Sequence, residues 1–162
     1  MGNKQTNILI ELGNLQVKNS TFTDGPIRHI VGKEAEVELD RVMMFNSSTN
    51  VGHGHGFWCV ECEKVTITDS TFYNLTSITG SAIYLQDLDN RDSRIEGNYF
   101  EANRANLEGG AVVLANTKNL SIANNTFKRN YVTPIVPSRV ELIEFLDDDD
   151  DVLKRRRLKR KL

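Results

Sequence analysis

An eight-residue pattern that recurs five times limits the folds open to this chain more than any other feature. Residues 15–22 read LQVKNSTF, residues 65–72 read VTITDSTF, and residues 120–127 read LSIANNTF. Two more divergent copies occupy residues 37–44 and 93–100. The five copies end on large apolar residues that are 22, 28, 28 and 27 residues apart. A period of this length is typical of a repeat architecture in which each unit stacks on the next.

A second pattern runs in phase with the first. Residues 109–114 read GGAVVL, residues 80–85 read GSAIYL, and residues 54–59 read GHGFWC. Each of these stretches precedes the final aromatic residue of the following copy by 17 to 20 positions. Two patterns that keep phase over three periods indicate one repeating structural unit rather than chance similarity.

The spacing inside each copy predicts short β-strands. Apolar residues alternate with polar ones, as at Val65 and Ile67, which is the period of a strand with one buried face. Asn, Asp, Gly and Ser separate these strands and favour turns. Because so short a unit cannot bury its own apolar face, successive copies must stack in parallel about 4.8 Å apart. We therefore predict an all-β fold, a right-handed, single-stranded parallel β-helix of about five coils over residues 1–138.

The register of the copies predicts which side chains stack inside the rod. The expected core ladder comprises Leu15, Val17, Phe22, Leu39, Met44, Val65, Ile67, Phe72, Ile95, Phe100, Leu120, Ile122 and Phe127. Gly54, Gly80 and Gly109 suit corners that need positive φ. At Asn19 and Asn124 we expect side-chain amides that hydrogen-bond along the rod, as in other stacked sheets. An antiparallel β-sandwich is the alternative fold, but it gives no reason for a ladder in phase.

The C-terminal region differs from the repeats. Residues 139–146 are expected to cap the open end of the stack with a short helix, because open strand edges must be covered. Residues 147–162 are expected to form a charged, disordered tail, in which five aspartates precede seven basic residues. The basic run is a candidate for weak contact with phosphates or a membrane surface, and residues 1–6 fit a myristoylation pattern.

Two signatures resemble the polymorphic outer-membrane protein repeat. Residues 109–112 read GGAV and residues 127–130 read FKRN, which match its Gly-Gly-aliphatic-aliphatic and Phe-x-x-Asn tetrads. Residues 100–103, FEAN, match the second tetrad again. The resemblance implies a parallel β-helix of pectin-lyase type, used in surface-displayed or secreted adhesion domains. It therefore implies an extracellular or cell-surface location.

Residues 52–56, GHGHG, are the most suggestive site for catalysis. A Gly-His-Gly motif resembles that of polygalacturonases, whose chemistry needs a general-acid carboxylate and a base that activates water. The candidates here are His55, Asp24 and Asp69, but no pair of aspartates accompanies the histidine. His55 also takes the place that Ser81 and Gly110 hold in other copies. We therefore predict no catalytic residue and keep a carbohydrate-active enzyme of pectin-lyase type as the alternative.

Metal binding has one candidate cluster. His53, His55, Cys59 and Cys62 are ligand types that zinc accepts. Cys59, however, aligns with leucines in other copies and is expected to face the core as a small apolar residue. The aspartates of residues 87–92 are the densest acidic group, but calcium needs six to eight converging oxygens. We therefore predict neither metal nor other cofactor.

The remaining observations concern partners and location. The net charge of −2 gives no indication of nucleic-acid binding, and no apolar run is long enough to span a membrane. The chain opens almost directly with a strand-like run, which suggests a fragment of a longer protein. Five Asn-x-Ser/Thr sequons would accept glycans in a secretory compartment. The predicted function is a non-catalytic repeat module with a structural, adhesion or surface-binding role, whose lateral face binds a protein or glycan.

Overall fold

The computed structural model describes residues 6–24, 28–48, 52–90 and 92–133, and in these ranges it contains strands and no helix. The capping segment predicted at residues 139–146 and the tail at residues 147–162 lie outside them. The strands are β1 (Thr6–Lys18), β2 (Thr21–Thr23), β3 (Arg28–Asp40), β4 (Met43–Ser48), β5 (Phe57–Val60), β6 (Lys64–Thr68), β7 (Thr71–Thr79), β8 (Ile83–Gln86), β9 (Arg94–Glu96), β10 (Tyr99–Glu101), β11 (Arg104–Glu108), β12 (Val112–Ala115), β13 (Ser121–Ala123), β14 (Thr126–Lys128) and β15 (Tyr131–Val132).

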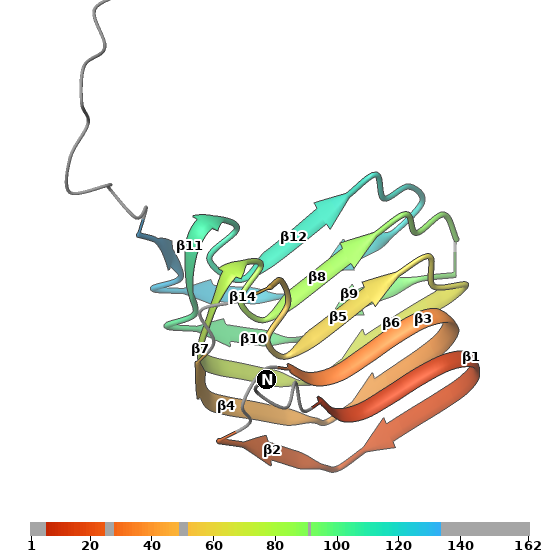
Figure 1. Ribbon diagram of the computed structural model, residues 1–162, viewed down its shortest axis with the longest axis horizontal. Helices are drawn as coiled ribbons and strands as arrows, with labels where there is room; N and C mark the ends of the chain where they lie inside the picture. The colour runs from red at the N-terminus through yellow and green to blue at the C-terminus, as the bar shows by residue number, and fades with distance from the viewer. Residues whose placement is uncertain (1–5, 25–27, 49–51, 91, 134–162) are drawn as a thin grey trace, which may run out of the picture.

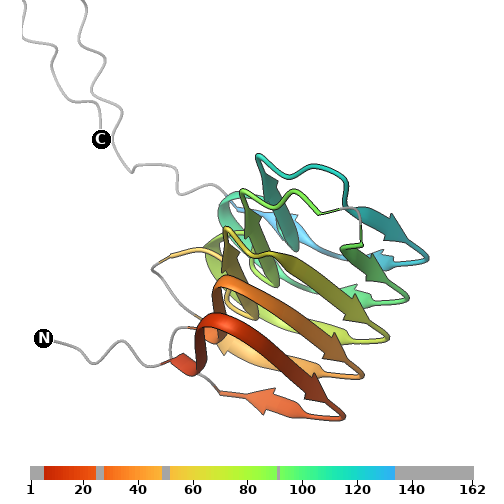
Figure 2. The same ribbon diagram turned by 90° about the vertical axis from the view of Figure 1, so that its right-hand side faces the viewer.

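Every pairing between these strands is parallel, so the chain winds into a β-solenoid. One sheet has the order β12-β8-β5-β3-β6-β9-β13, with β1 beside β3, and the other has the order β14-β10-β7-β11-β15, with β4 and β2 beyond β7. Figure 1 shows the coils stacked side by side, and Figure 2 shows the two sheets facing each other across the interior. The predicted parallel β-helix is confirmed, and the antiparallel sandwich is excluded for the described strands.

The first sheet is bent into two faces. The first part of β3 pairs with β5 and its second part pairs with β6, and Glu34, between these parts, has a φ of 47°. We call the strands β12, β8, β5 and the first parts of β3 and β1 the first face. The strands β13, β9, β6 and the second parts of β3 and β1 form the second face. The other sheet is the third face.

Corners repeat in every coil because the same backbone conformation recurs in register. Left-handed φ values occur at three corners of each coil and at a fourth corner in the later coils. Residues Asn19, Arg41, Asp69, Gly97 and Asn124 form one such row, and Asp24, Asn46, Asn74, Ala102 and Arg129 form another. The fourth corner uses Gly54, Gly80 and Gly109, as expected, with φ values of 57°, 55° and 55°. Asn, Asp and Gly tolerate this region best, which explains the turn residues of the repeat.

The interior is built from ladders of aligned side chains. Phe22, Met44, Phe72, Phe100 and Phe127 lie in direct register across neighbouring strands. Four full turns of the chain therefore separate the first of these five residues from the last. The rings of Phe72 and Phe100 stack with centroids 5.0 Å apart, and those of Phe100 and Phe127 with centroids 4.7 Å apart. A second ladder follows the same rule and consists of Val17, Leu39, Ile67, Ile95 and Ile122.

The ladders are buried in the middle of the rod and open at its ends. Leu39, Met44, Val65, Ile67, Phe72 and Phe100 are fully buried, whereas Leu15, Phe22 and Leu120 are only partly buried. Ile122 and Phe127 belong to the last coil and remain 47% and 52% exposed. In the stack that contains Val65 and Leu120, the intervening coil contributes the buried Ser93. Its Oγ accepts a hydrogen bond from the Val65 amide at 3.1 Å.

Stacked amides do occur along the rod, but not at the predicted residues. Asn98 Nδ2 donates to Asn125 Oδ1 at 3.0 Å, and Asn103 Nδ2 donates to Asn130 Oδ1 at 2.9 Å. Asn19 instead accepts from Arg41, and Asn124 lies 3.4 Å from Glu96. Both amides therefore hydrogen-bond to a side chain of the neighbouring coil, as expected, but the partner is a charged residue and not another amide. Exposed left-handed corners do not prevent stacking, because at the corners of Asn46 and Asn74 the Asn74 Nδ2 donates to Asn46 Oδ1 at 2.9 Å.

Candidate binding surface

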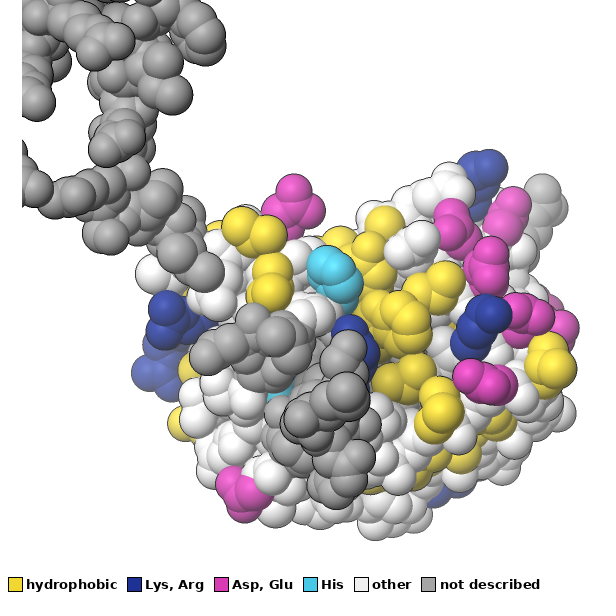
Figure 3. All heavy atoms as spheres, in the orientation of Figure 1, with side chains coloured by type: hydrophobic (Ala, Val, Ile, Leu, Met, Phe, Trp, Pro, Cys, Tyr) yellow, Lys and Arg dark blue, Asp and Glu magenta, His cyan; other side chains and the backbone are white. Residues whose placement is uncertain are grey.

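The first face carries a row of outward-pointing apolar and aromatic side chains. Trp58 lies in register with Val31 on one side and with Tyr84 on the other. Because side chains alternate along a strand, the neighbours Phe57, Cys59, Ile83 and Leu85 point into the core. The complete outward row is Leu9, Val31, Trp58, Tyr84 and Val113. Figure 3 shows hydrophobic side chains gathered across the middle of this face. We call this row the aromatic row.

Two polar side chains contact the two aromatic rings of the row. The guanidinium carbon of Arg28 lies 4.9 Å from the ring centroid of Trp58, which is cation–π geometry. The ring of His53 lies over Tyr84, with centroids 4.7 Å apart and planes inclined at 31°. Arg28 Nε also donates a hydrogen bond to the His53 carbonyl oxygen at 2.8 Å. These contacts fix both aromatic rings on the surface of the sheet.

The environment of these polar groups affects their charge. Partial burial and the neighbouring Arg28 charge lower the pKa of His53, which favours its neutral form. On the other side of the row lies Lys33, which pairs with Glu34 at 3.0 Å. That ion pair raises the pKa of Lys33. The corner beyond the row carries Glu34, Glu61 and Asp87 in successive coils, and Figure 3 shows acidic side chains along one edge of this face.

The stability of the fold does not explain why residue 58 is a tryptophan. Its indole Nε1 is covered and has no hydrogen-bond partner among the residues that the structure describes. Leaving a buried donor unpaired costs about 1–3 kcal/mol. A phenylalanine would fill the same outward position without this cost. Partly exposed aromatic rings with polar groups around them are typical of ligand-binding surfaces.

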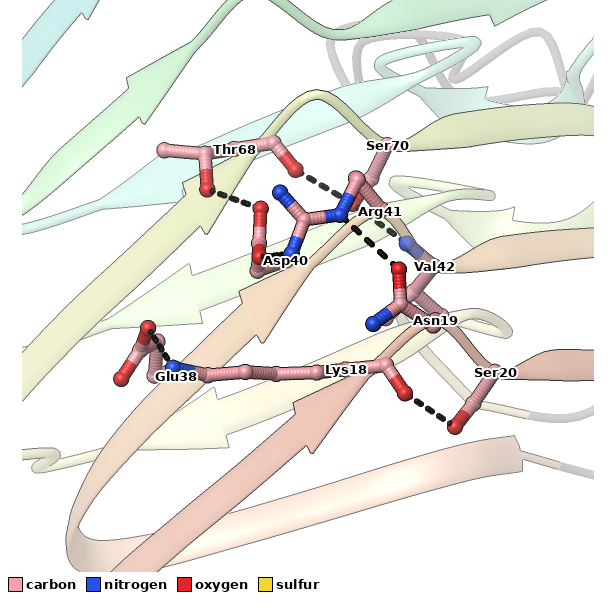
Figure 4. Close-up of polar contacts among 9 residues, drawn as sticks. All are labelled: Lys18, Asn19, Ser20, Glu38, Asp40, Arg41, Val42, Thr68 and Ser70. Atoms are coloured by element: carbon pink, nitrogen blue, oxygen red, sulfur yellow. Dashed lines mark hydrogen bonds and ion pairs between the residues drawn. The ribbon is translucent and has the colours of Figure 1, made fainter.

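The second face differs from the first because its outward side chains are polar. A shallow groove of about 300 Å³ crosses it. The residues that line this groove are Asn14, Leu15, Gln16, Glu36, Val37, Glu38, Lys64, Thr66 and Arg94. Glu38 pairs with Lys18 at 2.9 Å, and Figure 4 shows how this ion pair sits beside the corner of Asn19 and Arg41. At that corner Arg41 bonds Asn19 at 2.9 Å and Asp40 at 2.6 Å.

The catalytic candidates from the sequence do not converge on one external site. His55 is fully buried, and its backbone amide donates to the Ser81 carbonyl oxygen at 2.9 Å. Its place in the coil is thus the one that the alignment with Ser81 and Gly110 predicted. Asp24 and Asp69 are corner residues in two different rows. A general acid or base must come within hydrogen-bond reach of its substrate, and the interior position of His55 prevents this for a substrate on the outer surface.

The four candidate metal ligands also do not converge on one site. Cys59 and Cys62 form a disulfide with Cα atoms 6.1 Å apart, and both are buried. Their sulfur atoms pack over Gly32, where an added Cβ would lie 3.1 Å from Cys62 Sγ. His53 is exposed on the first face, whereas His55 is inside. Among the described residues no group of three or more His, Cys, Asp or Glu side chains could hold a metal ion.

Hydrogen bonds hold the described part of the acidic loop, residues 87–90 and 92. Asn116 and Gln86 donate to the Asp87 carboxylate and lower its pKa. Asn119 Nδ2 donates to Asp89 at 2.6 Å, and the Asp92 amide donates to Asn90 at 2.8 Å. These contacts join the loop to the next coil and to itself.

The aromatic row was not singled out in the sequence, although a signal for it existed. The second repeat pattern aligns Trp58, Tyr84 and Val113, and strand alternation places them outside when their neighbours face the core. Arg28 gave no such signal, because it reaches Trp58 across coils. The basic run and the N-terminal pattern of residues 1–6 extend into parts of the chain outside the described ranges. No helix within the described ranges could cross a membrane.

The coils, corners and flat outer faces define a parallel β-solenoid repeat protein. The family model described as the right-handed beta helix region matches residues 2–137. The chain therefore belongs to this family, which establishes the right-handed winding that we predicted. Comparisons with curated proteins and with solved structures found no significant match.

Proposed function

We propose that the protein is a non-catalytic binding module whose first face binds a linear glycan in an adhesion or surface-binding role. The aromatic row supports this proposal most strongly. Trp58 and Tyr84 lie directly opposite each other on adjacent strands, whose backbones are about 4.8 Å apart along the rod. Flat aromatic faces pack well against the apolar C–H faces of sugar rings, and the surrounding polar groups can bond hydroxyls.

A polymer with a regular repeat suits this surface better than a folded protein domain. Parallel strands present the same side-chain positions once per coil, so the face offers equivalent subsites along the rod axis. Arg28 and His53 flank the rings on one side, and Lys33 and Gln86 lie in the next outward row. Apolar platforms with a few placed polar groups are typical of small-ligand sites.

The single tryptophan of the chain makes the proposal directly testable. Trp58 is the only tryptophan, so fluorescence excited selectively in tryptophan reports on this face alone. Titration with neutral and acidic linear oligosaccharides is expected to give a saturable change for at least one of them. Tyr84→Ala should weaken that binding at least tenfold. Tyr73→Ala removes an exposed tyrosine from the third face and should leave affinity unchanged.

Two results would contradict glycan binding at the first face. One is the absence of any saturable fluorescence change across the oligosaccharide set, which would favour a protein partner. The other is equal weakening by Tyr84→Ala and Tyr73→Ala, which would point to a general loss of structure. Circular dichroism of each variant separates this second outcome from a local effect.

A carbohydrate-active enzyme is the second candidate, and the groove of the second face favours it. Glu36 and Glu38 lie on the same side of β3, and Lys64 is directly opposite Glu36. Glycoside hydrolysis requires two carboxyl groups across the scissile bond. Glu38 already forms an ion pair with Lys18, so we rank this candidate second. Release of new reducing ends from polygalacturonate, abolished by Glu36→Gln, would support it over the binding module.

We also propose that the protein works outside the cell or on its surface. The Cys59–Cys62 disulfide supports this location, because disulfides persist mainly in oxidising compartments. The five sequon asparagines are all exposed corner residues with positive φ, so their side chains are accessible to modification. Thiol trapping in intact source cells should find both cysteines oxidised. Two free thiols in the freshly trapped protein would contradict the proposal.

A further inference from the structure

The last coil leaves an apolar surface at the C-terminal end of the rod. β12, β13 and β14 each have a strand partner on one side only, namely β8, β9 and β10. Their inward side chains continue the buried ladders, yet Leu114, Ile122 and Phe127 are 39%, 47% and 52% exposed. An uncovered core end with unpaired strand edges promotes aggregation, so repeat proteins cover it with an atypical terminal segment.

This surface is hollow as well as apolar. A cavity of about 340 Å³ opens on it where the side chains of a sixth coil would stand. Its lining residues are Ile95, Ala111, Val112, Leu114, Ile122, Phe127 and Asn130, of which only the last is polar. The volume and the lining fit a few large apolar side chains better than water.

The chain leaves the last coil beside this hollow. β15 continues the stack on β11, and the Thr133 amide donates to the Ala105 carbonyl oxygen at 2.8 Å. The backbone of Tyr131 also packs against Gly110, where an added Cβ would lie 2.6 Å from the Tyr131 nitrogen. The described chain therefore ends at Thr133, at the level of the coil whose end is uncovered.

The sequence that follows has the character of an end cap. Ser138 and Glu141 match the Ser-x-x-Glu sequence pattern of a capping box at the start of the apolar run. If the run is helical, Glu141 and Glu144 share one side and the apolar residues take the rest. Those apolar residues are Val140, Leu142, Ile143, Phe145 and Leu146. The aspartates from residue 147 onward oppose the helix dipole and favour an end there.

We propose that residues 134–146 fold back as an amphipathic cap and bury the apolar hollow at the C-terminal end. An eight-residue helix is about 12 Å long, which matches the roughly 10 Å between facing sheets. Tethering favours this occupant over a second copy. A short flexible connection gives an effective concentration in the millimolar range, above any micromolar concentration of free chains.

The test uses the full chain and a matched pair of variants. Ile143→Asp combined with Phe145→Asp places charges on the apolar side of the segment. Val152→Asp makes a similar change in the charged tail and serves as the control. Amide hydrogen exchange of β12, β13 and β14 is expected to accelerate at least tenfold in the double variant only. Exchange in β6, in the middle of the rod, should stay unchanged and shows that the rod is folded.

Dye binding and size measurements complete the design. Wild type should be monomeric by light scattering and bind little hydrophobic dye, whereas the double variant should bind the dye and self-associate. Unchanged exchange in β12 to β14 would overturn the proposal. So would a wild-type dimer whose dissociation alone exposes these strands, since a second copy would then be the occupant. If the double variant unfolds throughout, Ile143→Ala must still accelerate exchange at that end, and failure to do so overturns the proposal.

Discussion

The imidazole rings of His29 and His55 lie edge to face inside the rod, with centroids 5.4 Å apart. Both side chains are fully buried, and His29 Nε2 shares a hydrogen bond with Ser47 Oγ at 3.0 Å. Burial, reinforced by His55 and opposed by Asp24, lowers the pKa of His29 to about 4. The rod thus keeps a titratable side chain neutral in its interior.

This burial makes stability depend on pH. The unfolded chain binds a proton at His29 near the ordinary pKa of 6.5, whereas the folded chain binds it near about 4. The contribution of neutral His29 is therefore complete above pH 6.5 and is lost as the pH falls toward 4. The total loss in unfolding free energy is roughly 3 kcal/mol. Urea unfolding between pH 7.5 and 4 should show it.

The variant His29→Phe isolates this effect from the titration of carboxylates. It should have a flatter pH profile than wild type over the same range, whatever its absolute stability. His53→Ala removes a surface histidine whose pKa is lowered less, so it should flatten the profile less than His29→Phe does. Parallel profiles for wild type and His29→Phe would show that His29 does not couple folding to pH.

The aromatic ladder should contribute strongly to stability. Phe100 is fully buried and stacks on Phe72 and Phe127. Phe100→Ala removes both contacts and leaves a cavity, so it should lower the unfolding free energy by about 4 kcal/mol. Phe45→Ala truncates an outward ring on the third face and should cost about 1 kcal/mol or less. Chemical denaturation measures both. Equal losses would mean that the ladder is no more important than the surface.

The buried amides should matter as much as an apolar side chain of similar size. Asn103 Oδ1 accepts from the Leu75 amide at 3.1 Å, and its Nδ2 donates to the Phe72 carbonyl oxygen at 2.9 Å. Asn103→Ala leaves these buried backbone groups unpaired, which should cost about 2–5 kcal/mol. Asn14→Ala, at an exposed position, should change the unfolding free energy by less than about 0.5 kcal/mol. An Asn103→Ala variant as stable as wild type would argue that water replaces the amide.

The disulfide should contribute modestly because it closes a very short loop. Cys59 and Cys62 are three residues apart, and the loop-closure relation gives about 2 kcal/mol for such a ring. Reductant should therefore lower the unfolding free energy of wild type by about that amount. The double variant Cys59→Ala, Cys62→Ala should be insensitive to reductant. If the unfolding free energy of wild type does not change although the bond is demonstrably reduced, this estimate is contradicted.

The repeat made the fold predictable, because the same residue types recur at the same corner and strand positions. The Phe22 to Phe127 spacing established the register of every coil, and alternation established which side chains face the core. The positions of His55 and Cys59 inside the rod followed from their alignment with Ser81, Leu85 and Leu114. Local rules and periodicity were sufficient for these conclusions, since each concerns a neighbour one period away.

Other features depended on geometry that the period does not contain. Asn19 and Asn124 bond to the neighbouring coil as expected, but their partners are Arg41 and Glu96. Stacking of amide on amide inside the rod occurs at Asn98 and Asn103 instead. The Cys59–Cys62 bond and the approach of Arg28 to Trp58 were also not derivable, because they depend on side-chain directions around corners and between coils.

The sequence alone therefore determined the architecture, the register and the interior of this protein. The reason is that stacking of the coils repeats the alternation of inward and outward side chains at every turn. Only the tertiary structure decided what the outer surface offers: an aromatic row on one face, a polar groove on the next and an open apolar end. These surfaces combine side chains from several coils, and their chemistry depends on packing and exposure that no single repeat encodes.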